Sequence, residues 1–207
     1  MTHHERRGRT RRSLFGTAAC ATALLLAGCQ SGGDDASGSD DGDDAPADVD
    51  ASSYAIDDHP IDEPVEFGDE HACPICNMRV ERYGSWRAQL AHEDGTGLFF
   101  DTPGCCVAYV AGADAAGASD EPIETVWMTD FETRNLFEAS EGYLVRETDL
   151  GRQDFPMGGS PIPFEDRADA EAYVEEYDDL SEDEIVTLDD VDREFAEFYR
   201  GNRVPEE

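Results

Sequence analysis

The chain has 207 residues, which is enough for one ordinary domain together with an export leader and a linker. It has 49 acidic residues against 15 basic ones, all of them arginine, and its formal net charge is −34. This charge argues against nucleic acid as a partner, because nucleic-acid binding needs a basic face. Acidic residues are spread among apolar ones, which favours a halophilic domain over an acidic interaction tail or a disordered chain. Molar salt shortens the Debye length to ~3 Å and screens the self-repulsion.

The N-terminus reads as a targeting segment. The stretch Arg11 to Phe15 resembles a twin-arginine export signal. The apolar run 16–28 is shorter than the ~20 residues that span a bilayer and fits a signal peptide. It ends in Leu26-Ala27-Gly28-Cys29, which resembles a lipobox. We therefore expect residues 1–28 to be a twin-arginine lipoprotein signal peptide and Cys29 to be lipidated. A short uncleaved anchor is the alternative; either places the domain on the extracytoplasmic face of the membrane.

Residues 29–65 are rich in Asp, Gly, Ser and Ala and hold few large apolar side chains. Such a segment cannot bury enough surface to offset its chain entropy, so it is predicted to be a disordered acidic tether. Its predicted role is that of a flexible linker, long enough for a lipid-anchored domain to contact a partner at a distance from the anchor. His59 falls in this segment and is interpreted as a solvated linker residue.

The folded domain is predicted over residues 66–200. Its first half reads as strand, strand, helix, strand, at about 86–92, 96–101, 103–112 and 123–129. Thr102 and Pro103 are the N-cap and first-turn residues expected of the helix. The second half repeats this order at about 143–148, 161–164, 166–177 and 184–188, and a last helix is expected over 189–200.

The two halves also match in sequence. Phe100-Asp101 precedes an Ala-Tyr-Val triplet at 108–110, and Phe164-Glu165 precedes the same triplet at 172–174, with an offset of 64 residues at both places. We interpret this as two ββαβ units, at about 70–130 and 140–190. The predicted fold class is α+β, with antiparallel sheets and packing helices.

Soft metal chemistry is indicated by the stretch His71-Ala72-Cys73-Pro74-Ile75-Cys76-Asn77-Met78. Thiolate and thioether together select Cu(I) over hard ions, and zinc does not usually accept thioether. Cys76 and Met78 are the predicted core of a Cu(I) site. Cys73, Met157 and His71 are the candidates for a further ligand.

Four cysteines remain outside the leader and the lipobox, and paired cysteines of exported proteins usually form disulfides. A Cys73–Cys76 disulfide is therefore the main competitor of the metal site. Cys105 and Cys106 are interpreted first as core residues of a helix. Cys105 is the better ligand candidate of the two, because it lies nearer the helix N-terminus, where thiolate is favoured. His92 is expected at the surface.

Several motifs together resemble the NosL family of copper-binding lipoproteins that accompany nitrous oxide reductase. The motifs are Cys73-Pro74-Ile75-Cys76-Asn77-Met78, Trp86-Arg87-Ala88-Gln89, Phe100-Asp101, Gly104-Cys105, Phe155-Pro156-Met157-Gly158 and Pro163-Phe164. Cys76 and Met78 correspond to the family's Cys-x-Met copper motif, and Met157 to its later Pro-Met-Gly motif. The chain departs from the family at Asn77, where Gly is more usual. Asn tolerates left-handed backbone angles better than most residues.

This resemblance implies two ββαβ units and Cu(I) binding. It implies delivery of copper to nitrous oxide reductase, with a membrane transporter complex as a further partner. No nucleophile with a paired base is evident in the sequence, so no enzymatic activity is predicted. Two other functions are also compatible with the residues of the Cys73–Cys76 motif. One is an extracytoplasmic thiol–disulfide protein that uses Cys73 and Cys76. The other is a structural zinc site built from Cys73, Cys76 and two distant ligands.

Overall fold

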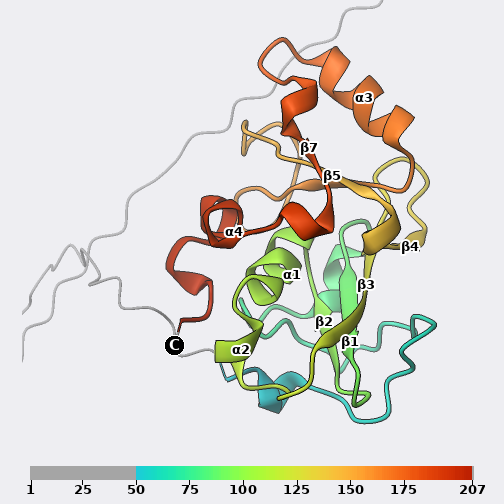
Figure 1. Cartoon of the computed structure of the whole chain (residues 1–207), viewed down its shortest axis with the longest axis vertical. Coiled ribbons are helices and arrows are strands. Elements are labelled where there is room, and N and C mark those ends of the chain that lie inside the picture. The colour runs from blue at the N-terminus through green and yellow to red at the C-terminus, as the bar shows by residue number, and fades with distance from the viewer. Residues whose placement is uncertain (1–49, 207) are drawn as a thin grey trace, which may run out of the picture. The chain divides into compact units, whose positions relative to one another are not determined.

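The computed structural model describes residues 50–206. The predicted signal peptide, the lipidation site Cys29 and the first part of the predicted tether lie outside the described residues. Within 50–206, no helix has both the length and the apolar character needed to cross a membrane. The described chain is α+β, with two antiparallel sheets and packing helices (Figure 1), which confirms the predicted fold class.

The first sheet has the strand order β2-β1-β3-β4, and each neighbouring pair is antiparallel. Its strands are β1 (Ala88–His92), β2 (Gly97–Phe100), β3 (Ile123–Thr129) and β4 (Leu136–Glu138). Every residue of β1 and β2 is buried, so both faces of these strands are covered. The chain turns between them at Gly95, whose φ of 82° glycine adopts without strain.

The second sheet has the order β6-β5-β7, formed by β5 (Tyr143–Val145), β6 (Ile162–Phe164) and β7 (Ile185–Val186). This order repeats β2-β1-β3, with the first strand of each unit in the centre. A helix follows the second strand in both units: α1 (Pro103–Val110) and α3 (Arg167–Glu176). Tyr109 and Tyr173, which the repeat pairs, are both buried. The structure therefore confirms the two predicted ββαβ units.

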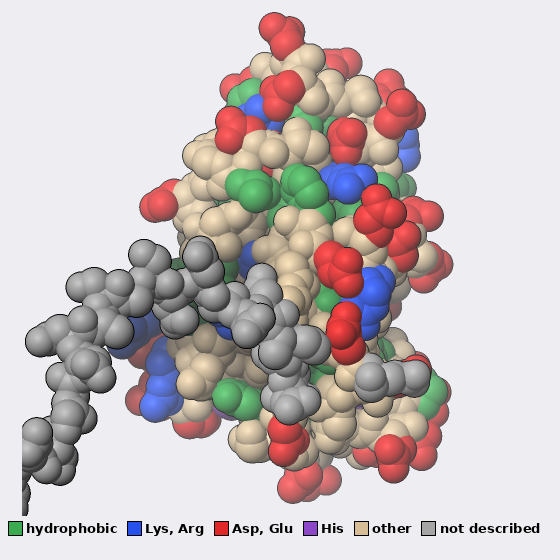
Figure 2. All heavy atoms as spheres, turned by 90° about the vertical axis from the view of Figure 1, so that its left-hand side faces the viewer, with side chains coloured by type: hydrophobic (Ala, Val, Ile, Leu, Met, Phe, Trp, Pro, Cys, Tyr) green, Lys and Arg blue, Asp and Glu red, His purple; other side chains and the backbone are tan. Residues whose placement is uncertain are grey.

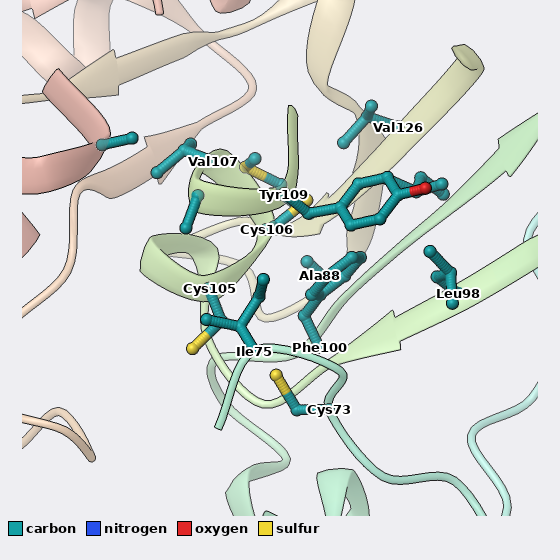
Figure 3. Packing of buried hydrophobic residues seen from close by; sticks show 14 of the residues in the cluster. Cys73, Ile75, Ala88, Leu98, Phe100, Cys105, Cys106, Val107, Tyr109 and Val126 are labelled. Carbon is teal, nitrogen blue, oxygen red and sulfur yellow. The ribbon is translucent and has the colours of Figure 1, made fainter. Parts of the chain in front are cut away.

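Helix α1 is the most enclosed helix of the first unit, and all of it except Val110 is buried. The Oγ1 atom of Thr102 accepts a hydrogen bond from the backbone N–H of Cys105, and Pro103 occupies the first turn, as predicted. Helix α4 (Arg193–Arg200) packs against α1 (Figure 1). Figure 3 shows the side chains of α1 meeting those of the sheet in the larger hydrophobic core.

Short helical turns connect these elements. They are η1 (Ala51–Tyr54), η2 (Val80–Tyr83), α2 (Ala113–Ala116), η3 (Ala139–Glu141), η4 (Glu182–Glu184), η5 (Leu188–Asp190) and η6 (Gly201–Arg203).

The packed part of the chain begins before residue 66, which corrects the predicted boundary of the tether. The backbone N–H of Ile56 donates to the carbonyl oxygen of Gly97 at 2.9 Å, on the open edge of β2. His59 is 3% exposed, and its ring stacks on Trp127 with centroids 5.5 Å apart. Its Nε2 lies 2.9 Å from Oε1 of Gln89. The polar composition of this segment hid its structural role, which is to cover an unpaired strand edge.

Three smaller expectations also differ from the structure. Strand β4 was not predicted. The last helix begins at Arg193 rather than 189, because Asp192 caps it by accepting a hydrogen bond from the backbone N–H of Phe195. His92 is buried rather than at the surface, and its Nε2 lies 2.8 Å from the hydroxyl oxygen of Tyr109.

Candidate metal site

A tight turn at residues 73–78 brings the two cysteines of the predicted motif together. The backbone N–H of Asn77 donates to the carbonyl oxygen of Cys73 at 2.8 Å, and the N–H of Cys73 donates to that of Met78 at 2.9 Å. Asn77 has a φ of 58°, which lies in the left-handed region. Asparagine fits this turn, because it adopts the left-handed angle more readily than most residues.

The turn predicts an order of stability for substitutions at Asn77. Asn77→Ala is expected to lower the free energy of unfolding by about 1–2 kcal/mol, because the Cβ atom of alanine clashes with the backbone at a left-handed angle. Asn77→Gly is expected to cost less, although it loses the hydrogen bond that the Tyr54 hydroxyl donates to Oδ1 of Asn77 at 3.3 Å. Urea unfolding of the reduced, metal-free protein measures both values. A glycine variant less stable than the alanine variant would show that the backbone angle does not control this turn.

Asp101 and Cys105 approach the turn from the junction of β2 and α1. The thiol of Cys76 donates to Oδ1 of Asp101 at 3.2 Å. The Sγ atoms of Cys73, Cys76 and Cys105 and one carboxylate oxygen of Asp101 all lie within 4.8 Å of one another. We call these four residues the thiol cluster. It joins residues from two parts of the sequence into one set of possible metal ligands.

The thiol cluster is enclosed on most sides. Cys73, Asp101 and Cys105 are each 0% exposed, and Cys76 is half-buried. Figure 3 shows Cys73 and Cys105 at the same end of α1, with Cys106 farther along the helix near Tyr109. The four cysteines in residues 50–206 are all free thiols. The cluster therefore offers three thiol sulfurs to an ion that enters beside Cys76.

Arg200, at the end of α4, provides a positive charge next to the thiol cluster. Its side chain is buried, and its Nε donates to Sγ of Cys105 at 3.1 Å. The same guanidinium donates to Oγ1 of Thr102 at 2.7 Å and to the carbonyl oxygens of Gly159 and Tyr199 at 2.9 and 2.8 Å. Arg200 thus fixes the start of α1 against the loop that contains Gly159.

The three thiols have different affinities for their protons. Burial alone raises the pKa of Cys105, but hydrogen bonds from Cys73 and Cys76, together with the charge of Arg200, outweigh burial and hold that pKa well below its usual value. Burial and the hydrogen bond to Cys105 raise the pKa of Cys73. The hydrogen bond to Cys105 is also the largest cause that raises the pKa of Cys76. Among the three thiols, Cys105 therefore loses its proton most readily.

Asp101 is the hard donor of the thiol cluster. Burial, followed by the negative charge of Cys105, raises the pKa of its carboxyl group to about 6. Its Oδ2 is one of three buried side-chain nitrogen or oxygen atoms within residues 50–206 that have no hydrogen-bond partner. A buried carboxylate oxygen without a partner is costly, and a bound ion would satisfy it.

The raised pKa of Asp101 predicts a pH effect on the stability of the metal-free protein. Its usual pKa is 3.8 and its folded-state pKa is about 6, so folding favours the protonated form. The resulting stability is complete below about pH 4 and is lost as the pH rises through about 6. Relative to Asp101→Asn, the wild type should lose roughly 3 kcal/mol across this window. Urea unfolding of both proteins between about pH 4 and pH 7 measures the difference, and a difference independent of pH would contradict it.

Met78 and Met157 line a second feature, a surface pocket of about 430 Å³ that also includes Tyr83, Gly84 and Trp86. Both methionines are half-buried. Met157 has a φ of 65°, a left-handed angle that is uncommon for a residue other than glycine. The structure thus brings the two predicted methionine ligands to one pocket, which we call the methionine pocket.

His71 lies outside the thiol cluster. Its ring stacks on Phe99 with centroids 3.7 Å apart, and its Nδ1 accepts a hydrogen bond from the backbone N–H of Gly68 at 3.1 Å. Its Nε2 lies 3.5 Å from a carboxylate oxygen of Glu70. Burial lowers the pKa of His71 more than Glu70 raises it, so the neutral form is favoured. Packing against Phe99 explains this histidine without a metal.

Two members of the thiol cluster were not among the residues predicted as ligands. Asp101 and Cys105 are separated from the Cys73–Cys76 motif by the whole β1–β2 hairpin. Cys105 was already the better ligand candidate of the two helix cysteines, because thiolate is favoured near a helix N-terminus. Asp101, which directly precedes Thr102 at the same strand-to-helix junction, could have been found by the same feature. Arg200 has no comparable sequence feature, because its partners, apart from the adjacent Tyr199, come from two distant segments, at 102–105 and at Gly159.

Comparison with known proteins agrees with this architecture. No curated protein sequence matches the chain significantly. Among solved structures, the copper chaperone NosL from Shewanella denitrificans matches with a TM-score of 0.53 and 15% sequence identity, covering 65% of this chain and 99% of that one. At this identity the match shows a shared fold. The sequence profile of NosL matches residues 64–196, which is more than half of the chain. The chain therefore belongs to the NosL family.

Proposed function

We propose that this protein binds Cu(I) at the thiol cluster and carries it to a copper enzyme outside the cytoplasm. The observation that carries the proposal is the convergence of three thiol sulfurs and one carboxylate oxygen within 4.8 Å. Thiolate is the ligand that best suits Cu(I). Membership of the NosL family supports copper as the cargo, because the related Shewanella protein is described as a copper chaperone.

The geometry suits a carrier rather than an enzyme. Cu(I) would be held by Cys105, whose pKa is lowered, and by Cys73 and Cys76, which would release their protons when the ion binds. Cys76 lies on the half-buried side, where a ligand of the recipient can approach. Met78, two residues farther along, lies in the surface methionine pocket with Met157 and offers soft ligands outside the buried cluster. Such an arrangement supports transfer by ligand exchange.

The recipient we propose is nitrous oxide reductase, with a membrane transporter complex as a second partner; family membership is the support for both. The sequence features at the N-terminus support a protein anchored by lipid at Cys29 on the extracytoplasmic face of the membrane. A tether between that anchor and the domain would let the domain reach its recipient.

Competition with a Cu(I)-specific chelator tests the proposal. The reduced, metal-free protein is expected to take up one Cu(I) per chain, with an ultraviolet charge-transfer band from thiolate to copper. Cys76→Ser is expected to weaken binding, whereas Met78→Ala should change it little, because Met78 lies outside the cluster. A Cys76→Ser variant that binds Cu(I) as tightly as the wild type would contradict the site. Delivery is then measured as the activity gained by copper-depleted nitrous oxide reductase on incubation with the loaded protein, against the same amount of chelated Cu(I).

A zinc site is the second candidate, because the cluster offers four donors and zinc accepts thiolate and carboxylate in tetrahedral sites. The two ions should use Asp101 differently. Zn²⁺ needs its carboxylate as the fourth ligand, whereas Cu(I) is satisfied by the sulfurs. Asp101→Asn should therefore lower Zn²⁺ affinity while Cu(I) affinity changes little. Zn²⁺ affinity that Asp101→Asn leaves unchanged would contradict a zinc site with Asp101 as its fourth ligand.

A thiol–disulfide role is less well supported. Reactive Cys-x-x-Cys motifs need an accessible cysteine with a lowered pKa. Here the pKa values of Cys73 and Cys76 are raised, and the cysteine with the lowered pKa, Cys105, is fully buried. Reduction of insulin by the protein, at a rate that Met78→Ala leaves intact, would support this alternative.

A further inference from the structure

A second pocket, of about 630 Å³, lies beside the methionine pocket. Its lining includes Phe67, Arg87, Arg134 and Asn135, together with one acidic residue, Glu66. Gly84 lines both this pocket and the methionine pocket, so the two adjoin. We call it the arginine pocket, because it has two arginine side chains against one carboxylate.

The charge of the arginine pocket contrasts with the rest of the molecule. The chain has 49 acidic residues against 15 arginines, and the face in Figure 2 shows many acidic side chains with few basic ones among them. Arg152, Arg167 and Arg193 each form ion pairs with carboxylates. A local excess of arginine is therefore a departure from the general pattern of this surface.

Neither guanidinium of the arginine pocket has an ion pair or a hydrogen bond to any part of residues 50–206. Arg87 instead lies over the ring of Phe67, with its Cζ 4.4 Å from the centroid. Its Nε is buried without a partner, and burial lowers the pKa of the guanidinium, since no nearby carboxylate compensates for the lost hydration. Arg134 lies over Trp86 and Phe131, at 4.8 and 4.9 Å. The rings fix both side chains but leave their N–H groups unused.

We infer that the arginine pocket binds a carboxylate side chain of a protein partner. A planar guanidinium matches a carboxylate with two parallel hydrogen bonds, and two guanidinium groups in one pocket can clamp a single acidic residue. Glu66 in the lining disfavours anions of higher charge, such as phosphate. The partner's acidic residue would dock beside the methionine pocket, from which the copper ion would leave; this placement rests on the proposed function. The pocket thus gives a strongly acidic protein one local point of attraction to an acidic partner.

The test is a titration of the full chain with the capped peptide Gly-Glu-Gly, followed by the side-chain Nε–H resonances of Arg87 and Arg134. Saturable shifts are expected with this peptide and none with the matched peptide Gly-Gln-Gly. The double variant Arg87→Gln and Arg134→Gln should bind the peptide at least about tenfold more weakly, as judged from the amide of Gly84. The control, Arg167→Gln with Arg203→Gln, removes the same charge elsewhere and should bind like the wild type.

Four outcomes would overturn the inference: absence of a saturable shift, equal binding of the glutamine peptide, tighter binding of inorganic phosphate, or binding of free acetate as tight as that of the peptide. Acetate at equal affinity would identify a small-molecule carboxylate site instead of a protein-docking site. Cu(I) affinity separates this inference from the proposed function. The double variant should bind Cu(I) like the wild type, and a wild type that fails to bind Cu(I) would leave the peptide result standing.

Discussion

Cys105→Ala is expected to weaken Cu(I) binding by at least about a hundredfold, whereas Cys106→Ala should leave it close to that of the wild type. Loss of a group that only orients a metal ligand costs about 10–100-fold in affinity, and loss of a thiolate ligand should reach or exceed that range. Cys105 has its Sγ in the thiol cluster. Cys106 is equally buried and is next in sequence, but it is not part of the cluster. The two variants therefore remove the same chemical group from neighbouring positions of one helix.

Chelator competition measures both affinities, and urea unfolding of the metal-free proteins checks that each variant is folded. The charge-transfer band should weaken only in Cys105→Ala. An unchanged affinity for Cys105→Ala would contradict a site centred on the cluster. It would favour instead the site predicted from sequence, with Cys76, Met78 and Met157 as ligands. Equal losses in both variants would point to a general effect on α1 and not to ligation.

Arg200→Met should lower the free energy of unfolding of the metal-free protein by about 3–5 kcal/mol, the range observed when one partner of a buried charge pair is removed. The change leaves the Cys105 thiolate without its cation and leaves Thr102 Oγ1 and the carbonyl oxygens of Gly159 and Tyr199 without this donor. The midpoint of urea unfolding should fall with little change in its slope. The pKa of Cys105 should rise, because the charge of Arg200 helps to lower it.

Two control variants test whether the loss of stability in Arg200→Met comes from its contact with Cys105. Arg193→Met removes a half-buried arginine of the same helix, which is paired with Glu197 and donates to the carbonyl oxygen of Pro205, and it should cost less than Arg200→Met, about 1 kcal/mol. Adding Cys105→Ala to Arg200→Met should cost less than Cys105→Ala costs alone, because the thiolate that needs the arginine is then absent. Couplings of this kind are about 0.5–3 kcal/mol. Strictly additive losses would show that Arg200 acts as a packing residue and does not stabilise the thiolate.

The sequence predicted the fold better than it predicted the site. Strand β3 was predicted with its observed bounds, and Thr102 and Pro103 marked the start of α1, because alternation and capping are local properties of the chain. The covering of the β2 edge by residues around Ile56 and His59 was missed, because it depends on a strand edge that exists only in the folded sheet.

In the candidate site, the turn at Cys73–Cys76 and the left-handed angle of Asn77 could be predicted, because both depend on residues that are close in sequence. Cys105 was favoured over Cys106 as a ligand candidate because it lies nearer the helix N-terminus, but both were interpreted first as core residues and Cys105 stayed outside the predicted site. Asp101 and Arg200 were missed. Their roles depend on the packing of β2, α1 and α4 around one buried point.

The repeated strand order of the two sheets allows the two units to be compared position by position. The offset of 64 residues places Glu165 and Asp169 where the first unit has Asp101 and Cys105, at the matching junction before α3. The second unit therefore has the same strand and helix order as the first but no sulfur at the matching positions. The first unit also depends on residues outside itself, because Arg200 of α4 joins Cys105 and Thr102 to the loop that contains Gly159. A fragment that ends after the first unit would keep its three thiols but lose the arginine that contacts Cys105.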